Sequence, residues 1–142
     1  MSDAQKLAEQ IVASMIASVA FSQWLGIEIV EVAPRRSTCR MTVRDEMVNG
    51  LGVTHGGIAF SLADSAFAYV CNGSNHASVA AQASIVFLGK AEEGETLVAE
   101  GWQVAREGRA GVTRVSVKTA EGRDVAEFTG YSRTLGGTVV EV

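Results

Sequence analysis

The feature that most constrains the fold of this chain is an apolar tract from Val53 to Val70, VTHGGIAFSLADSAFAYV. Between Glu46 and Lys90 the only formal charge, two histidines aside, is that of Asp64. A helix drawn through this tract is apolar on most of its surface, so it must be covered on most sides. A sheet curved around the helix would provide that cover. The tract therefore predicts a central helix wrapped by strands, and it raises the question of why one carboxylate is kept.

The central helix is expected over residues 57–72. On either side of it the chain contains stretches in which apolar and polar residues alternate, as they do in strands. An amphipathic helix is expected first, over about residues 4–24, capped by Ser2 and Asp3 and stopped at Gly26. Two strands then precede the central helix and four follow it, with short turns that favour antiparallel pairing. The expected strands cover residues 27–33, 37–45, 77–89, 96–108, 110–122 and 124–135.

These elements predict an α+β protein with a single domain over residues 1–142. A curved antiparallel sheet of about six strands would wrap around the long central helix, with the N-terminal helix outside. This architecture is the hotdog fold. In the first strand the alternation places Ile27, Ile29 and Glu31 on one face. In the second strand it places Cys39, Met41 and Val43 together, and in the fifth it groups Thr113, Val115, Val117 and Thr119.

Composition narrows the possible partners. The net charge of 12 − 16 = −4 argues against nucleic-acid binding, which requires a basic face. Residues 11–27 come nearest to a membrane span but contain three Ser and a Gln, and the first ten residues lack a basic signal-peptide flank. Cys39 and Cys71 form no ligand cluster with the two histidines, so we expect free thiols, no metal site and a cytoplasmic protein without a resident cofactor.

Three interpretations of Asp64 are open from the pattern alone. The carboxylate could be a core group paired with hydroxyl or backbone donors, because an unpaired buried carboxylate is costly. It could lie on the one free side of the helix. It could also be a catalytic carboxylate at a seam between two subunits.

The start of the same helix offers complementary chemistry. His55-Gly56-Gly57 stands where backbone N–H groups lack helical partners and where the helix dipole favours negative charge. Glycines there let a ligand approach the backbone, so Gly56 could polarise a carbonyl and Gly57 could contact the substrate. His55 could act as a general base, orient a substrate, or simply hydrogen-bond the first turn of the helix.

The spacing of these groups has a geometric consequence. Gly56 and Asp64 are 64 − 56 = 8 positions apart, which is roughly 12 Å along a helix axis. One acyl carbon cannot touch both groups of a single chain. Two copies of the helix packed antiparallel would bring Asp64 of one copy near Gly56 of the other, so a shared site requires at least a dimer.

The segment NGLGVTHGGIAFSLADSAFAYVCNG resembles the core motif of hotdog-fold acyl-CoA thioesterases of the PaaI type, from phenylacetic acid degradation. The resemblance runs from about Leu25 to the terminal LGGTVVEV. It implies that Asp64 is the catalytic base or nucleophile, that Gly56 is the oxyanion donor, and that His55 and Asn49 orient the thioester and the loop. It also implies a dimer of dimers.

Some positions differ from that family pattern or have a simpler reading. Ala80 and Ser18 stand where some relatives carry a water-positioning hydroxyl and an asparagine. Taken alone, Asn49 before Gly50 is also typical of an ordinary turn. Three basic residues, expected to cluster around one hairpin, could meet the phosphates of coenzyme A or simply solubilise the surface. They are Arg106, Arg109 and Arg114.

The expected function is therefore hydrolysis of an acyl-CoA thioester of the phenylacetyl or hydroxyphenylacetyl type, in phenylacetate catabolism. Two alternatives remain at this point. One is a hotdog enoyl-CoA hydratase or dehydratase, although His55-Gly56-Gly57 differs from the HFP-like motif common in those enzymes. The other is a non-catalytic acyl-CoA-binding module on the same fold.

Overall fold

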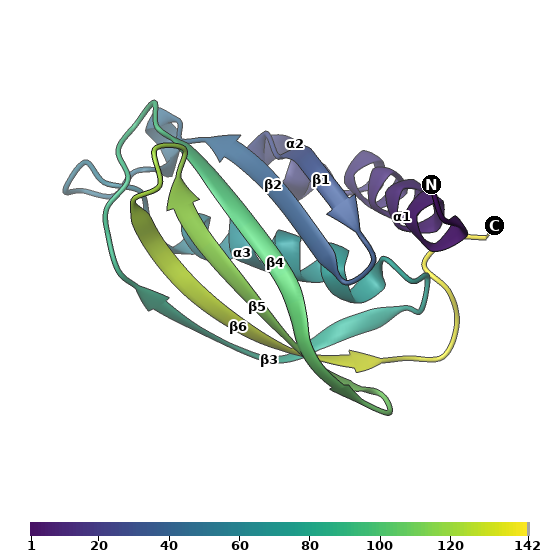
Figure 1. Ribbon diagram of the computed structural model, residues 1–142. Helices are drawn as coiled ribbons and strands as arrows, with labels where there is room; N and C mark the ends of the chain where they lie inside the picture. Colours follow the sequence, from purple (N-terminus) through teal and green to yellow (C-terminus); the bar gives the residue numbers. More distant parts are fainter. Residues whose placement is uncertain (142) are drawn as a thin grey trace.

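The computed structural model describes residues 1–141 and shows a six-stranded antiparallel sheet curving around a long helix (Figure 1). This helix, α3, spans Gly56–Asn72 and begins one residue before the expected start. The strand order is β1-β2-β4-β5-β6-β3, so β1 and β3 form the two edges. The expected hotdog architecture is confirmed, with Val142 outside the described residues. The strands are β1 (Glu28–Ala33), β2 (Arg36–Thr42), β3 (Ser78–Phe87), β4 (Thr96–Glu107), β5 (Ala110–Thr119) and β6 (Asp124–Thr134).

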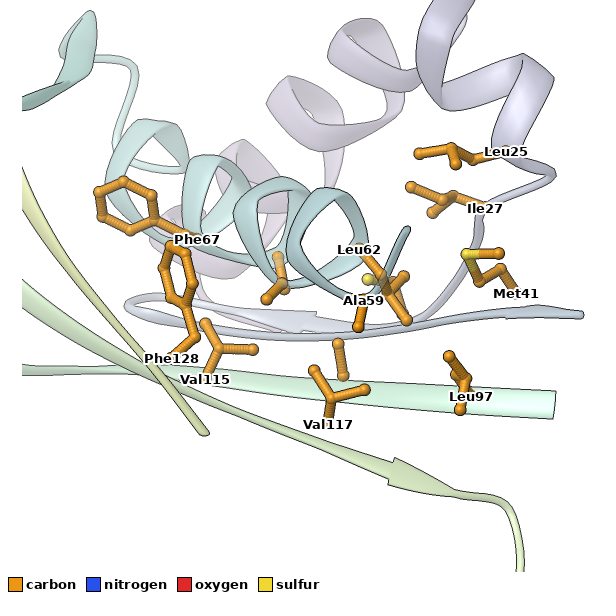
Figure 2. Close-up of a cluster of buried hydrophobic side chains, with 14 of the residues drawn as sticks. Leu25, Ile27, Met41, Ala59, Leu62, Phe67, Leu97, Val115, Val117 and Phe128 are labelled. Atoms are coloured by element: carbon orange, nitrogen blue, oxygen red, sulfur yellow. The ribbon is translucent and has the colours of Figure 1, made fainter. Parts of the chain in front are cut away.

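The core lies between α3 and the concave face of the sheet (Figure 2). Leu62 and Phe67 of α3 face the sheet, where β5 contributes Val115 and Val117 and β6 contributes Phe128. All five side chains are buried because the strands alternate in and out as their sequences predict. The inward faces expected for the second and fifth strands are confirmed.

A close approach between α3 and β6 fixes how the helix is rotated about its axis. A Cβ atom at Gly130 would lie 2.7 Å from Cε2 of Phe67, so only glycine admits the ring there. On the other side, the Ser37 hydroxyl of β2 donates to the backbone oxygen of Ala66 at 2.9 Å. With Phe67 and Ala66 held against the sheet, the face of α3 that carries Asp64 is directed away from it.

The N-terminal region contains two helices where the sequence predicted one. Helix α1 spans Asp3–Ser18 and α2 spans Ala20–Leu25. Val19 between them is extended, with φ −107° and ψ 104°. The Gln23 side chain donates to the oxygen of Ala17 at 2.8 Å, which satisfies a carbonyl left free where α1 ends. Because of this break, Val19 is exposed and lies outside both helices, whereas the helix expected over residues 4–24 included it.

The cap at Ser2 and the stop at Gly26 are confirmed, whereas Asp3 is the first residue of α1 rather than its cap. The Ser2 hydroxyl accepts a hydrogen bond from the Gln5 N–H at 3.1 Å and caps α1. Gly26 ends α2 in the left-handed conformation, with φ 74°. Neither α1, α2 nor α3 is long and apolar enough to cross a membrane.

The first strand departs from simple alternation. A β-bulge between Ile29 and Glu31 inserts Val30 as an extra residue opposite β2. Val30 is consequently 53% exposed, whereas Val32 is 6% exposed and joins the core. The predicted grouping of Glu31 with Ile27 and Ile29 on one face is therefore wrong, because Glu31 is exposed whereas Ile27 is buried. The short turns expected between the later strands are confirmed at Glu107-Gly108 and Glu121-Gly122, where both glycines have positive φ.

Candidate active site

The sheet leaves one face of α3 uncovered, and Asp64 lies on it. Small residues recur along this face at helical spacing and are only partly buried or exposed. A helix face of this kind lets a second helix approach closely. The residues of this uncovered face are Gly57, Ser61, Asp64, Ser65 and Ala68.

Asp64 has no partner on its own chain. Within residues 1–141 its carboxylate makes no hydrogen bond and no ion pair. The neighbouring hydroxyls are directed elsewhere: Ser61 donates to the oxygen of Gly57 at 2.7 Å and Ser65 to that of Ser61 at 2.8 Å. Partial burial raises the pKa of the Asp64 carboxyl above its ordinary value. The structure thus excludes a core carboxylate paired with Ser61, Ser65 or any other described residue.

His55 and Gly57 interact with each other at the start of α3. The Gly57 N–H donates to Nδ1 of His55 at 2.9 Å, so His55 is the N-cap of the helix. Because Nδ1 accepts this bond, Nε2 is the ring nitrogen left to contact other groups. The predicted contact of His55 with the first turn of the helix is confirmed. The same bond occupies the Gly57 N–H, so this amide is not free to bind a substrate.

The neighbouring amide, that of Gly56, remains free. It donates to no other atom in the part of the chain that the structure describes, and Gly56 is only partly buried. Gly56 is the first residue of a 17-residue helix, where the dipole adds to the attraction of a negative oxygen. This amide could therefore stabilise an oxyanion.

Asn49 shapes the loop that leads to the helix. Its side-chain oxygen accepts from the N–H of Leu51 at 2.9 Å and from that of Val53 at 3.3 Å. Its own N–H donates to the Val53 oxygen at 2.8 Å. These bonds close a tight Asx-type loop, as the turn interpretation predicted. Any contact of Asn49 with a substrate would have to use its side-chain nitrogen.

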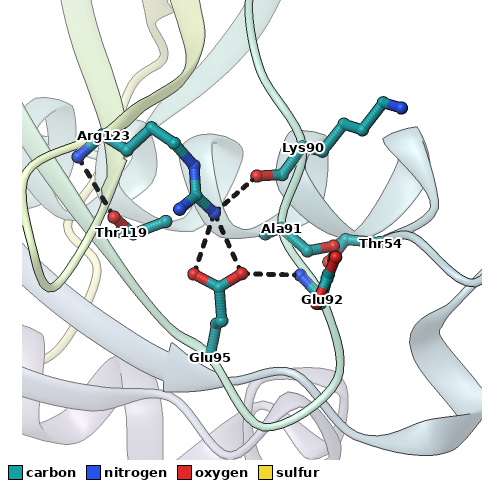
Figure 3. A network of polar contacts seen from close by, with 7 residues as sticks. All are labelled: Thr54, Lys90, Ala91, Glu92, Glu95, Thr119 and Arg123. Atoms are coloured by element: carbon teal, nitrogen blue, oxygen red, sulfur yellow. Dashed lines mark hydrogen bonds and ion pairs between the residues drawn. The ribbon is translucent and has the colours of Figure 1, made fainter.

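A polar network fixes the segment just before His55 (Figure 3). Both the N–H and the hydroxyl of Thr54 donate to the Ala91 oxygen, at 2.7 and 2.8 Å. The loop containing Ala91 is held in turn by Arg123, whose Nη2 lies 2.9 Å from both carboxylate oxygens of Glu95. The Glu92 N–H and Arg123 together lower the pKa of Glu95. No local sequence pattern indicates this long-range network, which positions the helix start.

The three arginines expected at one hairpin do not all gather there. Arg106 precedes the β4–β5 turn and donates to the Gly108 oxygen and the Thr134 hydroxyl, each at 3.2 Å. Arg109 lies in the turn itself and is exposed. Arg114 instead pairs in register with Trp102, further along the sheet, and forms an ion pair with Glu127 at 3.3 Å. The predicted cluster is thus wrong for Arg114, because it lies in the middle of β5.

The remaining titratable groups offer little further chemistry. Cys39 and Cys71 are buried free thiols, as predicted, and burial raises the pKa of each to about 12. Among residues 1–141 no group of three His, Cys, Asp or Glu side chains is arranged to hold a metal ion.

A family model described as the thioesterase superfamily matches residues 51–126, which is more than half of the chain and includes both Gly56 and Asp64. The chain belongs to the thioesterase superfamily. The acyl-coenzyme A thioesterase PaaI of Escherichia coli K12 is 39% identical to this thioesterase over 127 residues, covering 89% of this chain and 90% of the relative.

Solved structures agree with this assignment. The structure of E. coli PaaI, from the phenylacetic acid degradation operon, matches with a TM-score of 0.92 at 36% identity, covering 94% of this chain and 97% of that one. A hypothetical thioesterase from Streptococcus pneumoniae TIGR4, solved with coenzyme A, matches with a TM-score of 0.76 at 25% identity, covering 79% and 88%. This thioesterase therefore shares both fold and family with enzymes that hydrolyse thioesters.

Proposed function

We propose that this thioesterase hydrolyses phenylacetyl-CoA or hydroxyphenylacetyl-CoA to the free acid and CoA, as a cytoplasmic enzyme of phenylacetate catabolism. The coarser assignment to the PaaI-type acyl-CoA thioesterases rests on the family and on the E. coli relative. The acyl group and the pathway are inferred from that relative and from the operon named with its structure.

One observation carries the mechanism. Two groups suited to thioester hydrolysis, the Asp64 carboxylate and the Gly56 N–H, are both without partners, and both belong to α3. A carboxylate without donors can accept a proton from water, and a free helix-terminal amide can stabilise the negative oxygen that results. Every helix leaves its first amides without helical partners, so the unpaired Asp64 carboxylate on the same helix is what distinguishes α3.

The reaction that these groups support balances without a cofactor or a metal. With Asp64 as base, the carboxylate takes a proton from water while the water oxygen bonds to the thioester carbon. The carbonyl oxygen becomes an oxyanion and accepts a hydrogen bond from the Gly56 N–H. The intermediate then collapses, the carbon–sulfur bond breaks, and the proton on Asp64 passes to the departing CoA sulfur. If Asp64 is the nucleophile instead, an acyl-enzyme anhydride forms first and water cleaves it.

The two groups must come from different chains. They lie eight residues apart on one helix, roughly 12 Å, which is too far for a single acyl carbon. A second copy could dock along β3, which is an edge strand with its outer hydrogen-bonding groups unpaired. Val79 and Val86 on this strand are 48% and 58% exposed. Antiparallel pairing of two β3 strands would place the uncovered faces of two α3 helices side by side. We infer a dimer of this kind, assembled further into a tetramer as a dimer of dimers.

Other residues would bind the rest of the substrate. Arg106 and Arg109, at the exposed end of the β4–β5 hairpin, would meet the phosphates of CoA. His55, Gly57 and Asn49 would hold the loop and the first turn in the position that the thioester requires. The S. pneumoniae relative solved with coenzyme A supports CoA as the ligand of this fold.

A mixed-dimer experiment tests the shared site. Asp64→Asn removes the base and Gly56→Val crowds the amide, so each variant alone should be nearly inactive. Co-expression with two affinity tags would give mixed dimers in which one site has an intact Asp64 from one chain and an intact Gly56 from the other. Random assembly should restore about one quarter of the wild-type rate. Half of the dimers are mixed, and one of the two sites in each mixed dimer is intact. Recovery of no activity, with both variants folded and dimeric, would rule out the two-chain site.

A substrate panel tests the reaction itself. Release of free thiol from phenylacetyl-CoA, hydroxyphenylacetyl-CoA and aliphatic acyl-CoAs would be followed with a thiol reagent. Hydration of an enoyl-CoA without thiol release would instead identify a hydratase. Tight acyl-CoA binding without turnover would identify a binding module.

A further inference from the structure

An exposed aromatic ring stands beside the free amide of Gly56. Phe87 is the last residue of the edge strand β3, and it is 55% exposed. A Cβ atom at Gly56 would meet three atoms of its ring, at 3.0, 3.3 and 3.6 Å. The ring therefore lies directly against the first residue of α3, and the absence of a side chain at Gly56 is what admits it.

A second ring lies one turn further along the helix. Phe60 follows Gly56 by four residues, so both are on adjacent turns of the same side of α3. Phe60 is partly buried and packs edge-on against Phe128, with centroids 5.4 Å apart and planes at 69°. Phe128 packs against one side of the Phe60 ring, while part of Phe60 stays accessible to solvent. Phe87 of β3 and Phe60 of α3 thus lie at the first two turns of the helix, next to Gly56.

We propose that Phe87 and Phe60 form an acyl-binding subsite that selects aromatic acyl groups, with Phe87 as the specificity-determining residue. This proposal rests on the proposed function, because it requires the thioester carbonyl to bind the Gly56 N–H. An acyl group whose carbonyl oxygen meets that amide has its next atoms within reach of the Phe87 ring. An aromatic pair contributes about 0.5–1.5 kcal/mol beyond the burial of its apolar area. This corresponds to a preference of about 2-fold to 13-fold in kcat/KM for an aromatic over an aliphatic acyl group.

The ring also limits how a substrate approaches. Phe87 covers the side of Gly56 on which a side chain would stand, so the ring shields this residue in part from water. A partly desolvated amide makes a stronger hydrogen bond to a developing oxyanion than one surrounded by water. An ordinary packing role would not require an aromatic ring at this point, since leucine would cover the same glycine.

The experiment compares two substrates across matched variants. For wild type, Phe87→Leu, Phe87→Tyr and Phe21→Leu, kcat/KM would be measured with phenylacetyl-CoA and with hexanoyl-CoA, which has a similar apolar size. Phe87→Leu should lower the phenylacetyl-to-hexanoyl ratio about 2-fold to 13-fold, whereas Phe87→Tyr keeps the ring and should retain the wild-type ratio. Phe21 is 52% exposed on α2, so Phe21→Leu is a control with the same change at a similar exposure.

The outcomes separate this proposal from the proposed function. If wild type releases thiol but the ratio is unchanged in Phe87→Leu, the aromatic subsite is wrong and the thioesterase mechanism stands. If Phe87→Leu lowers both rates equally, and Phe87→Tyr does so too, Phe87 is only structural. If wild type releases no thiol from any acyl-CoA, the proposed function itself fails. Circular dichroism and size-exclusion profiles of each variant would show that it is folded and assembled.

Discussion

Replacing Asp64 with asparagine should abolish most of the activity while leaving the fold intact. The change keeps the shape of the side chain and removes its ability to accept a proton. Loss of a general base typically lowers the rate by about 10²–10⁴, or about 2.7–5.4 kcal/mol in the barrier. We expect the upper part of that range, because no other group on α3 could replace the carboxylate. The nearest titratable side chains on that helix are Tyr69 and Cys71, and burial keeps both protonated near neutrality.

The same substitution makes a prediction about pH. Burial raises the pKa of Asp64 in the folded chain, so its protonated form is favoured there relative to the unfolded chain. The stabilisation from the Asp64 carboxyl is therefore complete below its pKa in the unfolded chain, about 3.9, and is lost as pH rises through its pKa in the folded chain. At pH 7 Asp64→Asn should be at least as stable as wild type, and below about pH 4 the difference should narrow. In wild type, activity should fall as pH drops through the same folded pKa, and the variant should lack this acid limb.

The assay is free-thiol release from phenylacetyl-CoA, with urea denaturation of both proteins at neutral and acid pH. Asp124→Asn is the matched control, because it makes the same change at an exposed residue that lies 3.9 Å from Lys118 at the start of β6. That variant should keep the wild-type rate. The reasoning fails if Asp64→Asn hydrolyses the substrate at the parent rate. It also fails if the variant is clearly less stable at pH 7, since the carboxylate would then have a favourable partner.

Three further substitutions test the packing by urea denaturation. Gly130→Ala should lower the free energy of unfolding by about 1–3 kcal/mol, because its Cβ would lie 2.7 Å from the buried Phe67 ring; an unchanged value would mean that the ring moves freely. Thr113→Val should raise the free energy of unfolding by about 1 kcal/mol, because it removes a buried hydroxyl that has no partner among residues 1–141. A lower free energy of unfolding would mean that the hydroxyl does have a partner. Arg35→Gly should raise it by about 0.5–1 kcal/mol by relieving a φ of 63°, and Arg35→Ala should not.

Much of the fold could be predicted because its strongest signals are local and repeated. Strand β5 alternates between buried and more exposed residues along its 10 residues, and Gly108 and Gly122 mark the turns before and after it. The errors in the first helix and the first strand arose where a local event interrupts a periodic pattern. The extended Val19 divides the first helix, and the inserted Val30 reverses the facing of the first strand. Neither residue is unusual in its element, since valine is common in both helices and strands, so periodicity alone could not reveal the break or the bulge.

Residues of the candidate site were predictable only where their side chains differ in polarity from the neighbouring sequence. Asp64 stands out as one carboxylate in an apolar tract, and His55 stands out before two glycines. What the sequence could not show is which amide is free, since this depends on the hydrogen bond from Gly57 to His55. Nor could it place Phe87 against Gly56, because that contact joins residues far apart in the chain.

The lone carboxylate can be kept because the fold already leaves α3 incompletely covered. The sheet contacts the helix through Leu62, Ala66 and Phe67, so a charge on the opposite face does not disturb the core. In a single chain that face is only partly buried, and the burial that remains is enough to raise the pKa of Asp64. Docking a second copy would desolvate the carboxylate further and make its ionised form less favourable. The dimer would thus strengthen Asp64 as a proton acceptor while delivering the Gly56 amide of the other chain, so assembly and activation would be the same event.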